Sequence, residues 1–167
     1  MSTTKIDGAI VAEMVADALE FCAEKMGLRS KDQVAQALRS ADCTACEYLR
    51  FGLARVVAEY LGSLDPTVRA AYCYEPERAT TVDEAIASPG INLLVWVSHK
   101  SAALSSVVSL LRSLLAQERS SLDCPKGNAM CWLLDVQVVD DGEVQSRSGY
   151  GALLHSLHVR PLEIWRR

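Results

Sequence analysis

Two cysteines in the first third of the chain have the spacing of a metal or thiol site. Cys43 and Cys46 form a Cys-x-x-Cys motif directly after Asp42, at the start of an expected helix. The helix dipole lowers the pKa of a thiol at its N-terminus, so this pair could be redox-active or could bind zinc. Tetrahedral zinc needs two more ligands, for which Cys124 and Cys131 are the candidates. The alternative is that Cys46 simply packs on one face of its helix.

A second group of polar residues stands between an apolar strand and a long helix. Ser98, His99, Lys100 and Ser101 follow one another there. Ligands often bind beyond the carboxyl ends of strands, and the N-terminus of a helix attracts anions. His99 and Lys100 are therefore candidate ligand-binding residues. The competing interpretation is that Ser98 or Ser101 only caps the helix.

The pattern of apolar side chains predicts the elements that must position these residues. In the first third, apolar residues recur every three or four positions, which predicts helices over residues 6–26, 30–38 and 42–61. Gly27 and Gly62 are the expected ends of the first and third helices.

The rest of the chain alternates between strands and helices. β-Branched and aromatic runs predict four strands, over residues 68–74, 91–97, 130–139 and 159–165. A long helix is expected over residues 101–122 and a short one over residues 150–157. Asp140-Asp141-Gly142 indicates a tight turn, and Pro161 places the last strand at the edge of the sheet.

This order predicts an α/β or α+β protein with N-terminal helices, a small mixed sheet and a long crossover helix. A strand–helix–strand unit of this kind favours parallel pairing with a right-handed connection. Residues 1–64 would form the helical segment and residues 65–167 the α/β core. Whether the two form one compact domain is left open by the sequence.

Three segments resemble the core of a known family. They are Ala71-Tyr72-Cys73-Tyr74, Ile91-Asn92-Leu93-Leu94-Val95 and Leu133-Leu134-Asp135-Val136. Their order is similar to that of the nucleotidyltransferases of the DNA polymerase β type. In that family a first strand ends in an aromatic residue and Gly-Ser, a second opens with Asp-x-Asp-Leu-Leu-Val, and a third supplies another Asp. The resemblance implies a nucleotidyltransferase-like fold with Asn92 and Asp135 in the ligand site.

The residues that perform catalysis in this family are replaced in this chain. Glu75-Pro76 stands in place of Gly-Ser, and Gly90 and Asn92 stand where two carboxylates would bind Mg²⁺. Two-metal phosphoryl transfer needs several acidic oxygens, and only Asp135 is retained. The resemblance therefore implies a degenerate member of the family without catalytic activity. The competing interpretation of Asp135 is a strand residue at the end of the sheet, paired with an arginine or with water.

Composition and charge limit the class of function. The chain of 167 residues is 50% hydrophobic and 23% charged, as expected for a globular protein. Its net charge of −4 and the shortness of its basic tail, Trp165-Arg166-Arg167, argue against nucleic-acid binding. No apolar run is long enough to cross a bilayer and no signal peptide is evident, so we expect a cytoplasmic protein without a membrane partner. The apolar helical face of the first third favours a homodimer or another protein partner.

The leading hypothesis is a non-catalytic, nucleotidyltransferase-like domain that binds a partner or a small ligand, with a nucleotide as one candidate. One alternative is a metal-dependent nucleotidyltransferase with a rearranged carboxylate set, which requires acidic residues from positions 75–84 to approach Asp135. Another is a zinc-stabilised interaction module, which requires Cys43 and Cys46 to meet two further ligands. The sequence identifies neither a cofactor nor a substrate.

Overall fold

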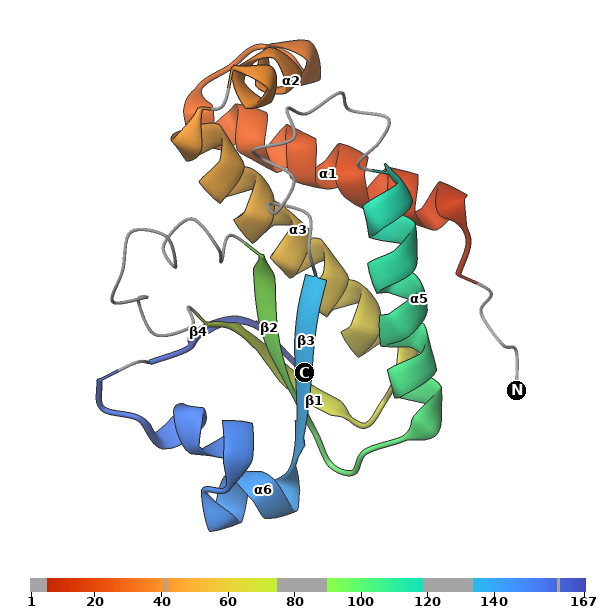
Figure 1. The fold of residues 1–167 in the computed structure, drawn as a ribbon, viewed down its shortest axis with the longest axis vertical. Coiled ribbons are helices and arrows are strands. Elements are labelled where there is room, and N and C mark those ends of the chain that lie inside the picture. Colours follow the sequence, from red (N-terminus) through yellow and green to blue (C-terminus); the bar gives the residue numbers. More distant parts are fainter. Residues whose placement is uncertain (1–5, 41, 75–89, 119–133, 159) are drawn as a thin grey trace.

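The computed structural model describes residues 6–40, 42–74, 90–118, 134–158 and 160–167. Within them, helices pack against a four-stranded mixed sheet, which confirms the predicted α/β class. Figure 1 shows helices α1, α3 and α5 grouped above and beside the sheet and helix α6 at its lower end. No helix of the described part combines the length and apolar character needed to cross a membrane.

The first third of the chain forms three helices, as predicted: α1 (Gly8–Met26), α2 (Lys31–Arg39) and α3 (Cys43–Leu64). Each begins at a polar side chain that accepts hydrogen bonds from the backbone N–H groups of the first turn. These N-caps are Asp7, Ser30 and Asp42. Gly27 ends α1 with a φ of 66°, a left-handed conformation that favours glycine.

Gly62 does not end α3, contrary to the prediction. The helix continues to Leu64 and ends at Asp65. A Cβ atom on Gly62 would lie 2.2 Å from a ring carbon of Trp165. The glycine is therefore required by the close approach of a later strand and not by a turn.

The sheet contains four strands: β1 (Val68–Cys73), β2 (Ile91–Val97), β3 (Leu134–Asp140) and β4 (Leu162–Arg166). Their order is β3-β2-β1-β4, with β1 antiparallel to both of its neighbours and β2 parallel to β3. Helix α5 (Ala102–Glu118) makes the predicted crossover between the two parallel strands. Pro161 precedes β4, which lies at the edge of the sheet as expected. Residues 119–122 of the predicted long helix and 130–133 of the predicted third strand lie outside the described residues.

The predicted tight turn at residues 140–142 is wrong. Asp140 is the N-cap of a short helix, α6 (Asp141–Ser146). Its carboxylate accepts the N–H of Glu143 at 2.9 Å, and the Glu143 carboxylate accepts the N–H of Asp140 at 3.0 Å. This reciprocal capping box starts a helix where the local dipeptides indicate a turn. The 3₁₀ helix η3 (Gly149–His155) follows, close to the predicted short helix.

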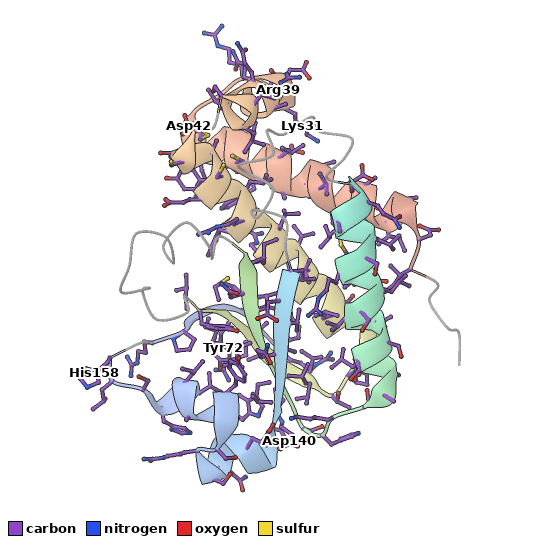
Figure 2. The ribbon with its side chains drawn as sticks, in the orientation of Figure 1. Lys31, Arg39, Asp42, Tyr72, Asp140 and His158 are labelled. Atoms are coloured by element: carbon purple, nitrogen blue, oxygen red, sulfur yellow. The ribbon has the colours of Figure 1, made fainter. Side chains whose placement is uncertain are left out.

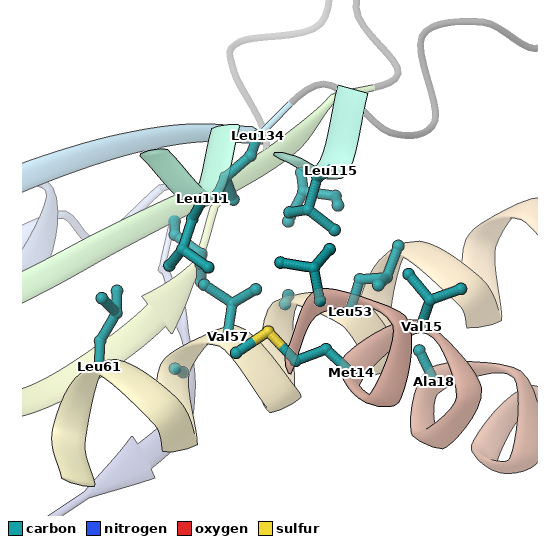
Figure 3. Packing of buried hydrophobic residues seen from close by; sticks show 14 of the residues in the cluster. Met14, Val15, Ala18, Leu53, Val57, Leu61, Leu111, Leu115 and Leu134 are labelled. Atoms are coloured by element: carbon teal, nitrogen blue, oxygen red, sulfur yellow. The ribbon is translucent and has the colours of Figure 1, made fainter. Parts of the chain in front are cut away.

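The main core lies between the helices and one face of the sheet, which we call the helix face. Alternate residues of β2 are buried there, and they are Ile91, Leu93, Val95 and Val97. Figure 3 shows Met14 and Val57 meeting Leu111 and Leu115 of α5 inside this core. Residues of both the helical segment and the α/β segment contribute to it. Most apolar side chains of α1 are thus buried within the chain, and the homodimer stays a prediction.

The opposite face of the sheet, which we call the α6 face, has a much smaller core. Ala70, Tyr72 and Leu94 lie on this face, and they pack with Val139 and with Val144 of α6. Trp96, Tyr74, Leu153 and Leu154 are only partly buried around them. Within the described residues, the α6 face is therefore less completely covered than the helix face.

Candidate functional site

Two of the predicted ligand-binding residues lie side by side on the α6 face. Asn92 of β2 and Asp135 of β3 are register partners on adjacent parallel strands. The same alternation that buries Leu93 on the helix face turns Asn92 toward the α6 face. The structure therefore brings an amide and a carboxylate together at the end of the sheet where β2 and β3 begin.

The Asp135 carboxylate is already engaged by protein groups. Gln137 Nε2 donates a hydrogen bond to it at 3.0 Å, and the Arg112 guanidinium lies 3.7 Å away. Burial, and then the Asp135 carboxylate and Tyr150, raise the pKa of the Tyr74 hydroxyl well above its usual value. These contacts agree with the competing interpretation of Asp135 as a strand residue paired with an arginine.

The described residues offer no metal site. No group of three or more His, Cys, Asp and Glu side chains in this part of the chain could hold a metal ion. The acidic residues at positions 75–84, which the enzymatic alternative needs, lie outside the described residues, as do Cys124 and Cys131. Both the metal-dependent enzyme and the zinc module thus stay hypotheses.

The Cys-x-x-Cys motif lies where it is predicted, in the first turn of α3. Cys43 is exposed and Cys46 is partly buried against the main core. The carboxylate of Asp42 accepts the N–H groups of Thr44 and Ala45. The N-cap therefore uses two of the backbone donors in the first turn of α3.

His99 and Lys100 lie at the other end of β2, roughly 20 Å from Asn92. His99 Nδ1 is 3.0 Å from the Ser98 hydroxyl, and Lys100 Nζ donates to Glu143 at 2.8 Å. Ser101 accepts a hydrogen bond from an N–H in the first turn of α5, so its predicted capping role is confirmed. The four predicted ligand-binding residues therefore form two separate pairs and not one site.

A hollow that sequence reasoning missed opens near His99 and Lys100. It has a volume of about 470 Å³, which lies within the range of small-molecule sites. Its charged wall consists of Arg69, Arg166 and Arg167, and we call it the three-arginine hollow. Trp96 and Ser98 contribute to the remaining wall. The pairing of β1 with β4 brings Arg69 next to the basic tail, which the sequence pattern alone does not indicate.

Asp141 fixes one side of this hollow. Its carboxylate accepts a hydrogen bond from Arg69 at 2.6 Å through one oxygen and from Trp96 Nε1 at 2.8 Å through the other. The Arg69 guanidinium carbon lies 6.0 Å from the centroid of the Trp96 ring. A cation and an aromatic ring are thus held together at the first residue of α6.

The other two arginines are also held by the protein. Arg166 donates hydrogen bonds to the carboxylate of Glu163 and to the hydroxyl of Tyr72. The distance from its terminal nitrogen to the Tyr72 hydroxyl oxygen is 3.0 Å. The hydrogen bond from Arg166 is the main reason that the pKa of Glu163 lies below its usual value. Arg167 donates through Nε to the backbone carbonyl of Val68 at 3.2 Å. All three guanidinium groups therefore have hydrogen-bond partners within the protein.

A second hollow of about 420 Å³ adjoins the first on the α6 face. Trp96 and Arg166 line both hollows. The second hollow is otherwise lined in part by apolar groups, which include Tyr72, Val144 and Leu154. Figure 2 shows Tyr72 over the sheet beside the chain segment of η3, which covers part of this face.

Comparisons with known proteins give no relative from which a function could be transferred. No protein-family model matches the chain, and no curated protein or solved structure matches it significantly. The resemblance to nucleotidyltransferases therefore stays a prediction from the residues.

Proposed function

We propose that this chain is a non-catalytic domain with a nucleotidyltransferase-like core that binds a small ligand on the α6 face of its sheet. The observation that carries this proposal is the environment of Asp135. Its strand neighbour is the amide of Asn92, and its carboxylate is engaged by Arg112 and Gln137. A pair of Mg²⁺ ions needs several carboxylate oxygens, and within the described residues this strand pair supplies one carboxylate, Asp135, beside the neutral amide of Asn92.

The order of elements supports the family part of the proposal. A strand that ends next to aromatic Tyr74, then β2, the crossover helix α5, and β3 with Asp135 follow one another as in the family core. The two hollows support the binding part. The second lies on the α6 face, and the first adjoins it through Trp96 and Arg166, whereas the described part of the helix face is covered by α1, α3 and α5.

The proposal is tested by measuring thermal unfolding and pyrophosphate release with a panel of nucleoside triphosphates, each with and without Mg²⁺. We expect no pyrophosphate release, and any stabilisation should be independent of Mg²⁺. A ligand at a hundred times its dissociation constant should stabilise the protein by about 2.7 kcal/mol.

The matched variants are Asp135→Asn and, as a control on the exposed surface of α1, Asp17→Asn. Neither variant should release pyrophosphate, and Asp17→Asn should bind nucleotides as the wild type does. Mg²⁺-dependent release of pyrophosphate that disappears in Asp135→Asn and persists in Asp17→Asn would show that the domain is an enzyme, and the proposal would be wrong.

A further inference from the structure

We propose that the three-arginine hollow binds the phosphate group of a small phosphate-bearing ligand. Three guanidinium groups, from Arg69, Arg166 and Arg167, line this hollow together with the ring of Trp96 and the hydroxyl-bearing Ser98. No carboxylate side chain belongs to its lining. The proposal names the ligand class of the binding function proposed above, and so rests on it. Its site lies at the opposite end of β2 from Asn92.

Three carboxylates contact residues that line the hollow, those of Asp65, Asp141 and Glu163, and two of them form ion pairs with its arginines. Arg69 is paired with Asp141, and Arg166 is paired with Glu163. Arg167 makes no ion pair with a described residue, and its contacts are with backbone carbonyl groups. An anion that enters therefore meets Arg167, which has no ion-pair partner among the described residues, and two arginines that each have a carboxylate partner. A ligand must therefore share these two arginines with Asp141 and Glu163.

The guanidinium groups keep donors for a ligand. A guanidinium has five N–H donors. Arg167 uses Nε and one terminal nitrogen to bind the carbonyls of Gly62, Val68 and Asp65, and within the described residues its other terminal nitrogen has no hydrogen bond. Arg69 uses one terminal nitrogen, toward Asp141. Since these side chains already have hydrogen-bond partners within the protein, less conformational entropy is lost when a ligand binds.

The arrangement favours phosphate over other anions. One arginine satisfies a carboxylate through a bidentate pair, whereas a phosphate monoester presents three acceptor oxygens and up to two negative charges. Three arginines around one hollow match that geometry. A polynucleotide would need a longer basic surface, which a chain with a net charge of −4 is not expected to have.

The test is calorimetric titration of the full chain with inorganic phosphate and with phenyl phosphate, at constant ionic strength set with sodium chloride. Arg69→Gln is the test variant. Arg55→Gln is the matched control, because Arg55 is an equally exposed arginine that pairs with Glu59 on α3, away from the hollow. We expect Arg69→Gln to weaken phosphate binding at least about tenfold, equivalent to about 1.4 kcal/mol, and Arg55→Gln to leave it unchanged.

Thermal unfolding of each variant shows whether it is folded. If Arg69→Gln does not fold, Arg69→Lys replaces it. Lysine keeps the charge but lacks the planar guanidinium donors, so a smaller but measurable loss of phosphate affinity is expected. Tighter binding of phenyl phosphate than of inorganic phosphate would identify an ester as the ligand, with its ring beside Trp96. Tighter binding of inorganic phosphate would identify the free anion.

Two results would overturn the inference. One is the absence of binding of either phosphate to the wild type at millimolar concentrations, and the other is equal weakening by Arg69→Gln and Arg55→Gln. Its failure is distinguishable from failure of the proposed function. If a nucleotide of the panel still stabilises Arg69→Gln without Mg²⁺, the binding domain stands and only the assignment of this hollow is wrong.

Discussion

The two faces of the sheet are built in different ways. On the helix face, Leu53 and Leu111 belong to a continuous apolar core that includes residues from α1, α3, α5 and the sheet. On the α6 face, a few apolar residues around Leu94 are bordered by arginines, carboxylates and two open hollows. The same strands supply both faces through alternation of their side chains. The difference indicates that the helix face contributes most of the buried apolar core, and it is the reason that we propose binding on the α6 face.

The largest expected effect is a difference in the free energy of unfolding between the same substitution made on each of the two faces. Leu111 is fully buried on the helix face, so Leu111→Ala should lower the free energy of unfolding by about 3 kcal/mol. Leu154 of η3 is only partly buried on the α6 face, so the same substitution there should cost about 1 kcal/mol. Urea denaturation of both variants measures the two values.

This pair tests the comparison directly, because the substitution is the same and the covering of the residue differs. Equal losses would mean that η3 is as tightly packed as α5. The α6 face would then belong to the stabilising core, and its hollows would be weaker candidates for a binding site.

The second effect concerns pH, and it arises on the helix face. Burial raises the pKa of the Cys73 thiol from 9.0 to about 11, although Arg50 lowers it slightly. The unfolded chain loses this proton near pH 9 while the folded chain keeps it. The buried, protonated thiol therefore contributes fully to the free energy of unfolding below pH 9. This contribution is lost as the pH rises from 9 to 11, by about 1 kcal/mol per pH unit.

Urea denaturation at several pH values between 8 and 11 measures this slope. The slope should be shallower in Cys73→Ala, although not flat, because burial also raises the pKa of Cys22 and Tyr74. Cys43→Ala is the control, since Cys43 is exposed at the start of α3. An unchanged slope in Cys73→Ala would mean that water reaches this position, and the helix face would be less closed than we describe.

Much of the fold follows from local features of the sequence. Ser30, Asp42 and Gly27 cap their helices as predicted, because capping depends on residues within one turn. The extent of β2 is also as predicted, since a continuous apolar run is typical of a strand covered on both faces. The strand order and the crossover helix confirm the predicted class.

The features that could not be predicted depend on residues far apart in the chain. Gly62 resembles a helix end until Trp165 packs against it. Arg69 and Arg166 become neighbours only because β4 returns to pair with β1. The sequence predicts candidate ligand-binding residues at both ends of β2, Asn92 at one end and His99 at the other. Local patterns could not show which end lies beside a hollow.

The smallest expected effect on stability is the sharpest test of the α6 face. Asp140→Ala removes the capping box of α6 and should cost about 1 kcal/mol. Asp42→Ala removes the N-cap of α3 at a similar cost. Only Asp140 precedes Asp141, whose carboxylate orients Arg69 at the three-arginine hollow. Two variants of nearly equal stability should therefore differ in phosphate affinity, which titration of both at the same ionic strength measures. Equal affinity would mean that α6 does not position Arg69 for phosphate binding. The proposed binding face would then no longer include α6.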